Sequence, residues 1–150
     1  MKKIASFSVD HNRLNPGVYI SRTDGDIVTY DLRFIKPNTP PFLEGRAMHT
    51  IEHLFATYAR NSHIAGSVIY FGPMGCRTGF YLLLRSVAHS QALDFIKEIT
   101  QKCAEHRGEI PGSAKEECGN YLEHNLPGAT AALQDFHEVI KPLRESDLNY

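Results

Sequence analysis

The chain reads Ala47-Met48-His49-Thr50-Ile51-Glu52-His53-Leu54-Phe55-Ala56-Thr57-Tyr58-Ala59-Arg60 near its centre, a run that contains neither proline nor glycine. Its apolar residues recur at intervals of three and four, which predicts an α-helix with one buried face. A helix advances about 100° per residue, so His53 lies one turn after His49 and only about 40° around the axis. Two imidazoles placed in this way can bind one metal ion, and Glu52 leans toward the same side.

The histidines and the glutamate form an H-x-x-E-H motif, an order found in some metallopeptidases. Histidine pairs at this spacing also occur by chance on surface helices, so the motif alone does not establish a metal site. This helix is otherwise apolar, and a buried imidazole needs a polar partner. A metal ion would supply that partner, and a third ligand is then expected elsewhere in the chain.

Composition limits the classes of protein that fit. The chain has 150 residues, 42% hydrophobic and 22% charged, which is typical of a globular protein, and we expect a single domain over residues 1–150. A net charge of -1 and a pI near 6.7 argue against nucleic-acid binding. No apolar run approaches the length of a membrane span, and no signal peptide is evident, so we expect no membrane partner and a cytoplasmic location.

Four segments have the composition of β-strands. They are 17–22, 27–35, 67–71 and 79–84. Asp24-Gly25 is typical of a tight hairpin turn, and the second segment alternates between apolar and polar positions. Two further helices are predicted, one over 90–106 and one around 132–140. The pattern predicts an α+β fold: an antiparallel sheet of about four strands, with helices packed on one face and the H-x-x-E-H helix carrying the metal.

Three cysteines do not form a disulfide framework, so each is treated as a thiol. Cys103 falls on the apolar stripe of the second helix and is expected in the core. Cys118 lies in a polar segment beside Gly119, where packing gives no reason for a thiol. With His49 and His53 it would complete a set of three protein ligands with an open fourth position, as in catalytic zinc sites.

Cys76 lies in a turn bracketed by glycines, next to Arg77. It could be an inert turn thiol, or the fourth ligand of a closed structural Cys2His2 site. A third possibility is an ionisable thiol whose pKa is lowered by a nearby cation or metal, so that it can transfer protons near neutral pH. Spacing alone leaves these alternatives open.

Several separate motifs together resemble one family, the S-ribosylhomocysteine lyases (LuxS). They are Ser6-Phe7, Asp10-His11-Asn12, Asp31-Leu32-Arg33-Phe34-Ile35-Lys36-Pro37-Asn38, His49-Thr50-Ile51-Glu52-His53-Leu54, Gly72-Pro73-Met74-Gly75-Cys76-Arg77-Thr78-Gly79-Phe80-Tyr81 and Glu117-Cys118-Gly119-Asn120-Tyr121. The resemblance extends from about Ser6 to Leu126. One departure is that Ile69-Tyr70-Phe71-Gly72 lacks the aspartate found before this turn in the family.

The resemblance implies a homodimer with active sites at the subunit interface and one divalent metal per subunit, Fe(II) in the family, with zinc or cobalt as possible replacements. It implies metal ligands at His49, His53 and Cys118. It implies catalytic acid–base residues at Glu52 and Cys76, and substrate-binding residues at Ser6, His11 and Arg33. Arg33 is also a candidate to hold Cys76 as a thiolate.

The implied reaction splits S-ribosylhomocysteine into homocysteine and 4,5-dihydroxy-2,3-pentanedione. The carbonyl group must migrate along the sugar before β-elimination can break the thioether. A Lewis-acid metal with an open position and two acid–base groups suit that chemistry. Two alternatives remain: a small H-x-x-E-H metallopeptidase, and a non-enzymatic module in which a metal only holds the fold.

Overall fold

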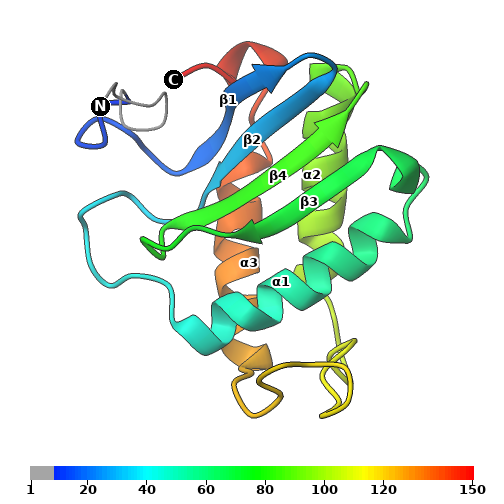
Figure 1. Cartoon of the computed structure of the whole chain (residues 1–150). Coiled ribbons are helices and arrows are strands. Elements are labelled where there is room, and N and C mark those ends of the chain that lie inside the picture. The colour runs from blue at the N-terminus through cyan, green and yellow to red at the C-terminus, as the bar shows by residue number, and fades with distance from the viewer. Residues whose placement is uncertain (1–8) are drawn as a thin grey trace, which may run out of the picture.

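The computed structural model describes residues 9–150 and contains one antiparallel sheet (Figure 1). Its strands are β1 (Gly17–Asp24), β2 (Ile27–Arg33), β3 (Val68–Pro73) and β4 (Gly79–Arg85). The helices are α1 (Gly45–Arg60), α2 (His89–Ala104) and α3 (Leu126–Ile140), with short 3-10 turns η2 (Ala65–Ser67) and η3 (Glu145–Asp147).

The strand order is β1-β2-β4-β3, so two hairpins lie side by side. The pairing of β2 with β4 joins them, with Tyr30 opposite Leu82. The helix α1 carries the chain from the first hairpin to the second. β2 ends at Arg33, two residues before its predicted end, because the amides of Phe34 and Ile35 both donate to the carbonyl of Thr78.

All three helices cover the same face of the sheet (Figure 1), which confirms the predicted α+β class. The core forms between this face and the helices. Its largest fully buried side chains include Tyr30, Phe55, Phe80, Phe95 and Phe136. Burying such side chains stabilises the fold by about 1.5–3 kcal/mol each.

Helix α1 shows why the periodic run folds as it does. Ile51, Leu54 and Phe55 are fully buried, whereas Glu52 and His53 on the other side are only partly covered. The apolar stripe therefore fixes the rotation of the helix and turns the His49, Glu52 and His53 side chains away from the core. Cys103 of α2 is fully buried, and this burial raises the pKa of its thiol, as expected of a core cysteine.

Helix α2 ends at Ala104, two residues before its predicted end. His106 instead bonds through Nδ1 to the Tyr58 hydroxyl and through Nε2 to the Glu109 carbonyl. Within residues 9–150, none of the helices has the length and apolar character that crossing a bilayer demands.

Candidate metal centre and active site

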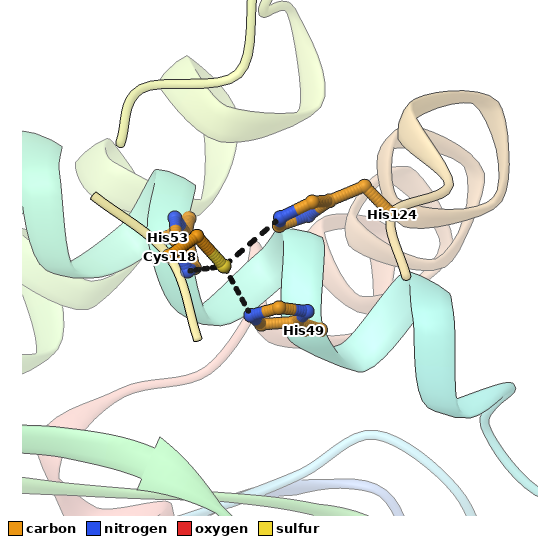
Figure 2. Close-up of side chains that lie close together, drawn as sticks. All are labelled: His49, His53, Cys118 and His124. Carbon is orange, nitrogen blue, oxygen red and sulfur yellow. Dashed lines mark hydrogen bonds between the residues drawn. The ribbon is translucent and has the colours of Figure 1, made fainter. Parts of the chain in front are cut away.

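A cluster of metal-binding side chains forms where α1 meets the segment between α2 and α3 (Figure 2). The cluster contains His49, His53, Cys118 and His124, and its donor atoms all lie within 4.8 Å of one another. The Cys118 sulfur lies 3.5 Å from Nε2 of His49, 3.9 Å from Nε2 of His53 and 3.8 Å from Nε2 of His124. The structure thus brings together the three residues that the sequence nominates as ligands.

Local backbone structure brings Cys118 to α1. The amides of Glu117 and Cys118 both donate to the carbonyl of Ala114 at 3.0 Å, closing a turn that presents the sulfur. Gly112 has a φ of +69°, which favours glycine, and a Cβ there would lie 3.4 Å from Nδ1 of His53. This glycine lets the loop pass against the imidazole.

His124 is the residue of the cluster that sequence reasoning missed. It lies just before α3, six positions after Cys118, and no periodicity or spacing rule connects it with α1. Its ring stacks on that of His49, with centroids 4.1 Å apart. Burial lowers the pKa of its imidazole, and repulsion from His49 and His53 lowers it further, which favours the neutral form that binds metals.

The Nδ1 atoms of the three histidines all face oxygen atoms, at the ring edge remote from the sulfur. Nδ1 of His49 lies 2.9 Å from the Glu123 carbonyl, and Nδ1 of His53 lies 2.9 Å from the Pro111 carbonyl. A carbonyl only accepts, so each of these rings carries its proton on Nδ1. The Nε2 lone pairs are left free to bind a metal, which is the usual arrangement of ligating histidines.

The residues present fit a divalent ion. Zinc bonds of about 2.3 Å to sulfur and about 2.1 Å to nitrogen, in a tetrahedral arrangement, separate the two donors by about 3.6 Å. The separations in this cluster are 3.5–3.9 Å. One thiolate and neutral imidazoles suit borderline ions such as zinc, iron(II) and cobalt(II). The sequence predicts three ligands and an open fourth position, whereas the structure adds a fourth donor, His124.

A hollow of about 450 Å³ adjoins the cluster on the side of α1 that carries Glu52. Its lining includes His49, Glu52, His53 and Cys118, together with Pro111 and Gly112. Three of the four donors and the predicted acid–base carboxylate therefore share one solvent-accessible surface. A small ligand entering this hollow meets the donors and Glu52 together.

Cys76 lies in a second hollow, of about 320 Å³, whose lining also includes His11, Arg33 and Tyr81. Its sulfur is 3.0 Å from the Thr78 hydroxyl and 3.9 Å from Nη1 of Arg33. Cys76 does not belong to the metal-binding cluster found in residues 9–150. Within one chain, the described residues therefore do not place Cys76 as the fourth ligand of a closed Cys2His2 site.

Arg33 is fixed by a buried partner on its own strand. It donates to Asp31 from Nε and Nη2 and to the Thr78 hydroxyl from Nη1. Burial alone would lower the pKa of Arg33, but the hydrogen bond and charge of Asp31 outweigh that effect and raise it. The Tyr150 hydroxyl donates to Oδ2 of Asp31 at 2.9 Å. Arg33 therefore stays charged and points toward Cys76.

The predicted site residues fall into two groups. His49, Glu52, His53 and Cys118 line the first hollow, and His11, Arg33 and Cys76 line the second. Among the described residues, the two linings have no member in common. Ser6, the remaining predicted substrate contact, lies outside the part of the chain that the structure describes.

Comparison with known proteins identifies the family. A family model described as S-ribosylhomocysteinase (LuxS) matches residues 4–145. An S-ribosylhomocysteine lyase of Clostridium acetobutylicum is 46% identical, and the alignment covers 100% of this chain and 99% of that protein. Lyases of the same name from Borreliella afzelii and Phocaeicola vulgatus are 43% and 44% identical, each over 100% of this chain and 99% and 98% of theirs. The chain therefore belongs to the S-ribosylhomocysteinase (LuxS) family.

Proposed function

We propose that this protein is a metal-dependent S-ribosylhomocysteine lyase, which releases homocysteine and 4,5-dihydroxy-2,3-pentanedione, the autoinducer-2 precursor. One observation carries the proposal: in a chain of this family, His49, His53 and Cys118 converge beside Glu52 at the edge of a hollow. We expect one divalent metal per subunit, iron(II) or, as a replacement, zinc or cobalt. This ion would act as a Lewis acid on a sugar oxygen and lower the cost of negative charge there by several kcal/mol.

Glu52 is proposed as the acid–base group for the sugar hydroxyls and the final elimination. Its side chain lines the same hollow as three of the donors and is only partly buried, so it can reach a bound sugar and exchange protons with it. A positioned acid–base group contributes about 10²–10⁴-fold to the rate of a proton transfer.

Cys76 is proposed to move protons during the isomerisation that precedes elimination. Nη1 of Arg33 and the Thr78 hydroxyl flank its sulfur, and both can stabilise a thiolate by donating to it. His11 and Arg33 line the same hollow and are proposed to contact the substrate together with Ser6. A thiolate able to take up and return protons is what repeated enolisation requires.

The separation of the two hollows supports a homodimer with active sites at the interface. A substrate must reach both the ion and Cys76, whereas the two linings on one chain have no residue in common. We propose that the Cys76 hollow of one chain faces the metal-binding cluster of its partner. The substrate is a small molecule, and the protein is proposed to act in the cytoplasm without a nucleic-acid or membrane partner.

The decisive test is release of homocysteine from S-ribosylhomocysteine by the Fe(II)- or Co(II)-loaded protein, followed with a thiol reagent. Cys76→Ala should retain the bound metal and lose turnover. Glu52→Gln should also retain the metal and lose turnover. A loaded wild-type protein that releases no homocysteine would refute the assignment. His63→Ala, at an exposed position on neither hollow, is the matched control and should keep full activity.

Mixing two inactive variants tests the interface. If each site combines the metal of one chain with Cys76 of the other, Cys76→Ala mixed with His53→Ala forms heterodimers in which one site is intact. Activity should then reappear after the subunits exchange. No recovery, with heterodimers shown to have formed, would assign both groups to the same chain.

The metallopeptidase alternative is not favoured. The matching family model is described as S-ribosylhomocysteinase, and the curated relatives are named S-ribosylhomocysteine lyase. A peptidase also has no need for Cys76 and its arginine partner, because a metal-activated water and Glu52 would suffice.

A further inference from the structure

We propose that Tyr150 is a positioning residue of the Cys76 hollow: its hydroxyl fixes the buried Asp31–Arg33 pair beside the thiol, and its ring closes one side of the hollow. The inference deepens the proposed function and rests on it in treating Cys76 as an acid–base thiol. Asp31, Arg33, Cys76 and Tyr150 all line this hollow of about 320 Å³. Tyr150 lies 119 positions after Asp31, so the fold alone brings them together.

The segment that carries Tyr150 is anchored along β1 (Figure 1). β1 is an edge strand, so backbone groups on its outer side are available to pair with another segment. The Ile20 amide donates to the Leu148 carbonyl at 2.7 Å, and the Leu148 side chain is completely buried in the core. Tyr150 therefore follows an anchored residue at a distance of only two positions.

The ring of Tyr150 has a fixed orientation. It stacks on the ring of Tyr19, with centroids 5.0 Å apart and an angle of 11° between the planes. The Tyr19 hydroxyl donates to the Asn15 carbonyl at 2.9 Å, so the ring beneath Tyr150 is held in turn. Tyr150 is 49% exposed, yet this stack directs its hydroxyl to Asp31.

The direction of the hydrogen bond follows from the charge of Asp31. Both Asp31 oxygens accept from Arg33, Oδ1 from Nε and Oδ2 from Nη2, as in a bidentate ion pair. A carboxylate only accepts, so Tyr150 donates to Oδ2, at 2.9 Å. Burial raises the pKa of the Tyr150 hydroxyl, and the charge of Asp31 raises it further, so this donor keeps its proton.

The bond from Tyr150 affects Cys76 through two residues. The side chains of Arg33 and Asp31 are 3% and 1% exposed, so little water screens their charges. The Tyr150 hydroxyl offsets part of the negative charge on Asp31, which would otherwise oppose a thiolate at Cys76. It also fixes the carboxylate that orients Arg33, whose Nη1 lies 3.9 Å from the Cys76 sulfur.

Two variants separate the roles of the hydroxyl and the ring. Tyr150→Phe removes only the hydroxyl, and Tyr150→Ala removes both. Alkylation of Cys76 by iodoacetamide at pH 7, followed by mass spectrometry on the metal-loaded protein, should be about 3- to 10-fold slower in Tyr150→Phe, because the thiolate is the form that reacts.

Homocysteine release provides the second measurement. Tyr150→Phe should lower kcat by about 10-fold, because the groups around the thiol are less well positioned, and should leave KM nearly unchanged. Tyr150→Ala should also raise KM, since one side of the hollow is lost. A residue that only stabilised the fold would not separate kcat from KM in this way.

Tyr58→Phe is the matched control, because the Tyr58 hydroxyl bonds to Nδ1 of His106 at 2.9 Å rather than to Asp31. It should leave the alkylation rate and kcat unchanged. If Tyr150→Ala fails to fold, Tyr150→Phe decides the question. An unchanged alkylation rate or kcat in Tyr150→Phe, or equal slowing in Tyr58→Phe, would overturn the inference. If the loaded wild type releases no homocysteine, the proposed function fails instead, and the alkylation rates still test Tyr150.

Discussion

Arg33 donates from Nε to Oδ1 of Asp31 at 3.1 Å, although the two residues are only two positions apart on β2. The side chains are 3% and 1% exposed, so the ion pair is almost completely removed from solvent. Residues i and i+2 of a strand lie on the same face, which explains how such close neighbours meet. Both residues line the hollow around Cys76, so a fixed ion pair lies beside this thiol.

Asp31→Asn should lower the free energy of unfolding by about 3–5 kcal/mol, because it leaves a buried guanidinium without its counter-charge. Urea denaturation measures this change. Asp26→Asn is the matched control: Asp26 pairs with Arg85 at 3.5 Å, but both side chains are more than half exposed. Such surface pairs contribute about 0–1 kcal/mol. Equal effects of the two substitutions would contradict the importance of burial.

Substitution by alanine should destabilise the protein at only one of two glycines near Cys76. A Cβ at Gly79 would lie 2.2 Å from the Leu32 carbonyl oxygen, so Gly79→Ala must push β4 away from β2. We expect a loss of about 1–3 kcal/mol, typical of overpacking, and slower alkylation of Cys76 as Arg33 shifts. A Cβ at Gly75 meets no atom within 4 Å, and Gly75→Ala should leave stability within about 0.5 kcal/mol. Thermal unfolding measures the change in stability of both variants. A destabilised Gly75→Ala would show that the turn has no room for a Cβ at this position.

Thr100→Val should stabilise the protein. Thr100 is completely buried in α2, and its hydroxyl finds no hydrogen-bond partner among the described residues. Removing an unpaired buried hydroxyl should raise the free energy of unfolding by about 1 kcal/mol. Thr50→Val is the matched opposite, since the Thr50 hydroxyl has three partners, and it should cost about 1–3 kcal/mol. Denaturant titration of the metal-free proteins measures both, and a destabilised Thr100→Val would mean that this hydroxyl has a partner.

Metal removal should loosen the segment between α2 and α3 before the rest of the fold. The donors connect α1 with this segment, so an ion bound only in the folded state adds stability by mass action. At 100 times its Kd, Zn(II) should raise the free energy of unfolding by about 2.7 kcal/mol. Calorimetry with and without Zn(II) measures the gain, and hydrogen exchange should show new protection around Cys118. His53→Ala should lose most of the gain, and an undiminished gain would place the ion elsewhere.

Local sequence patterns were enough to predict the elements that depend on neighbouring residues. The 3.6-residue spacing of Ile51 and Phe55 defined α1 and its buried face, and helical geometry placed His49 and His53 together. The alternation in β2 and the Asp24-Gly25 turn predicted the first hairpin, and the stripe of α2 placed Cys103 in the core. These predictions were correct because each depends on residues a few positions apart.

Contacts between groups that are distant in the sequence became visible only in the folded chain. His124 joins the cluster because the start of α3 packs on Thr50, a contact across 74 positions that no local pattern encodes. Asp31 and Arg33 lie on the polar face that the alternation in β2 predicts, which would normally face solvent. Thr78 and Tyr150 nevertheless bond to this pair and bury it. Chain packing sets such contacts, and packing depends on the shape of the whole molecule rather than on the period of one segment.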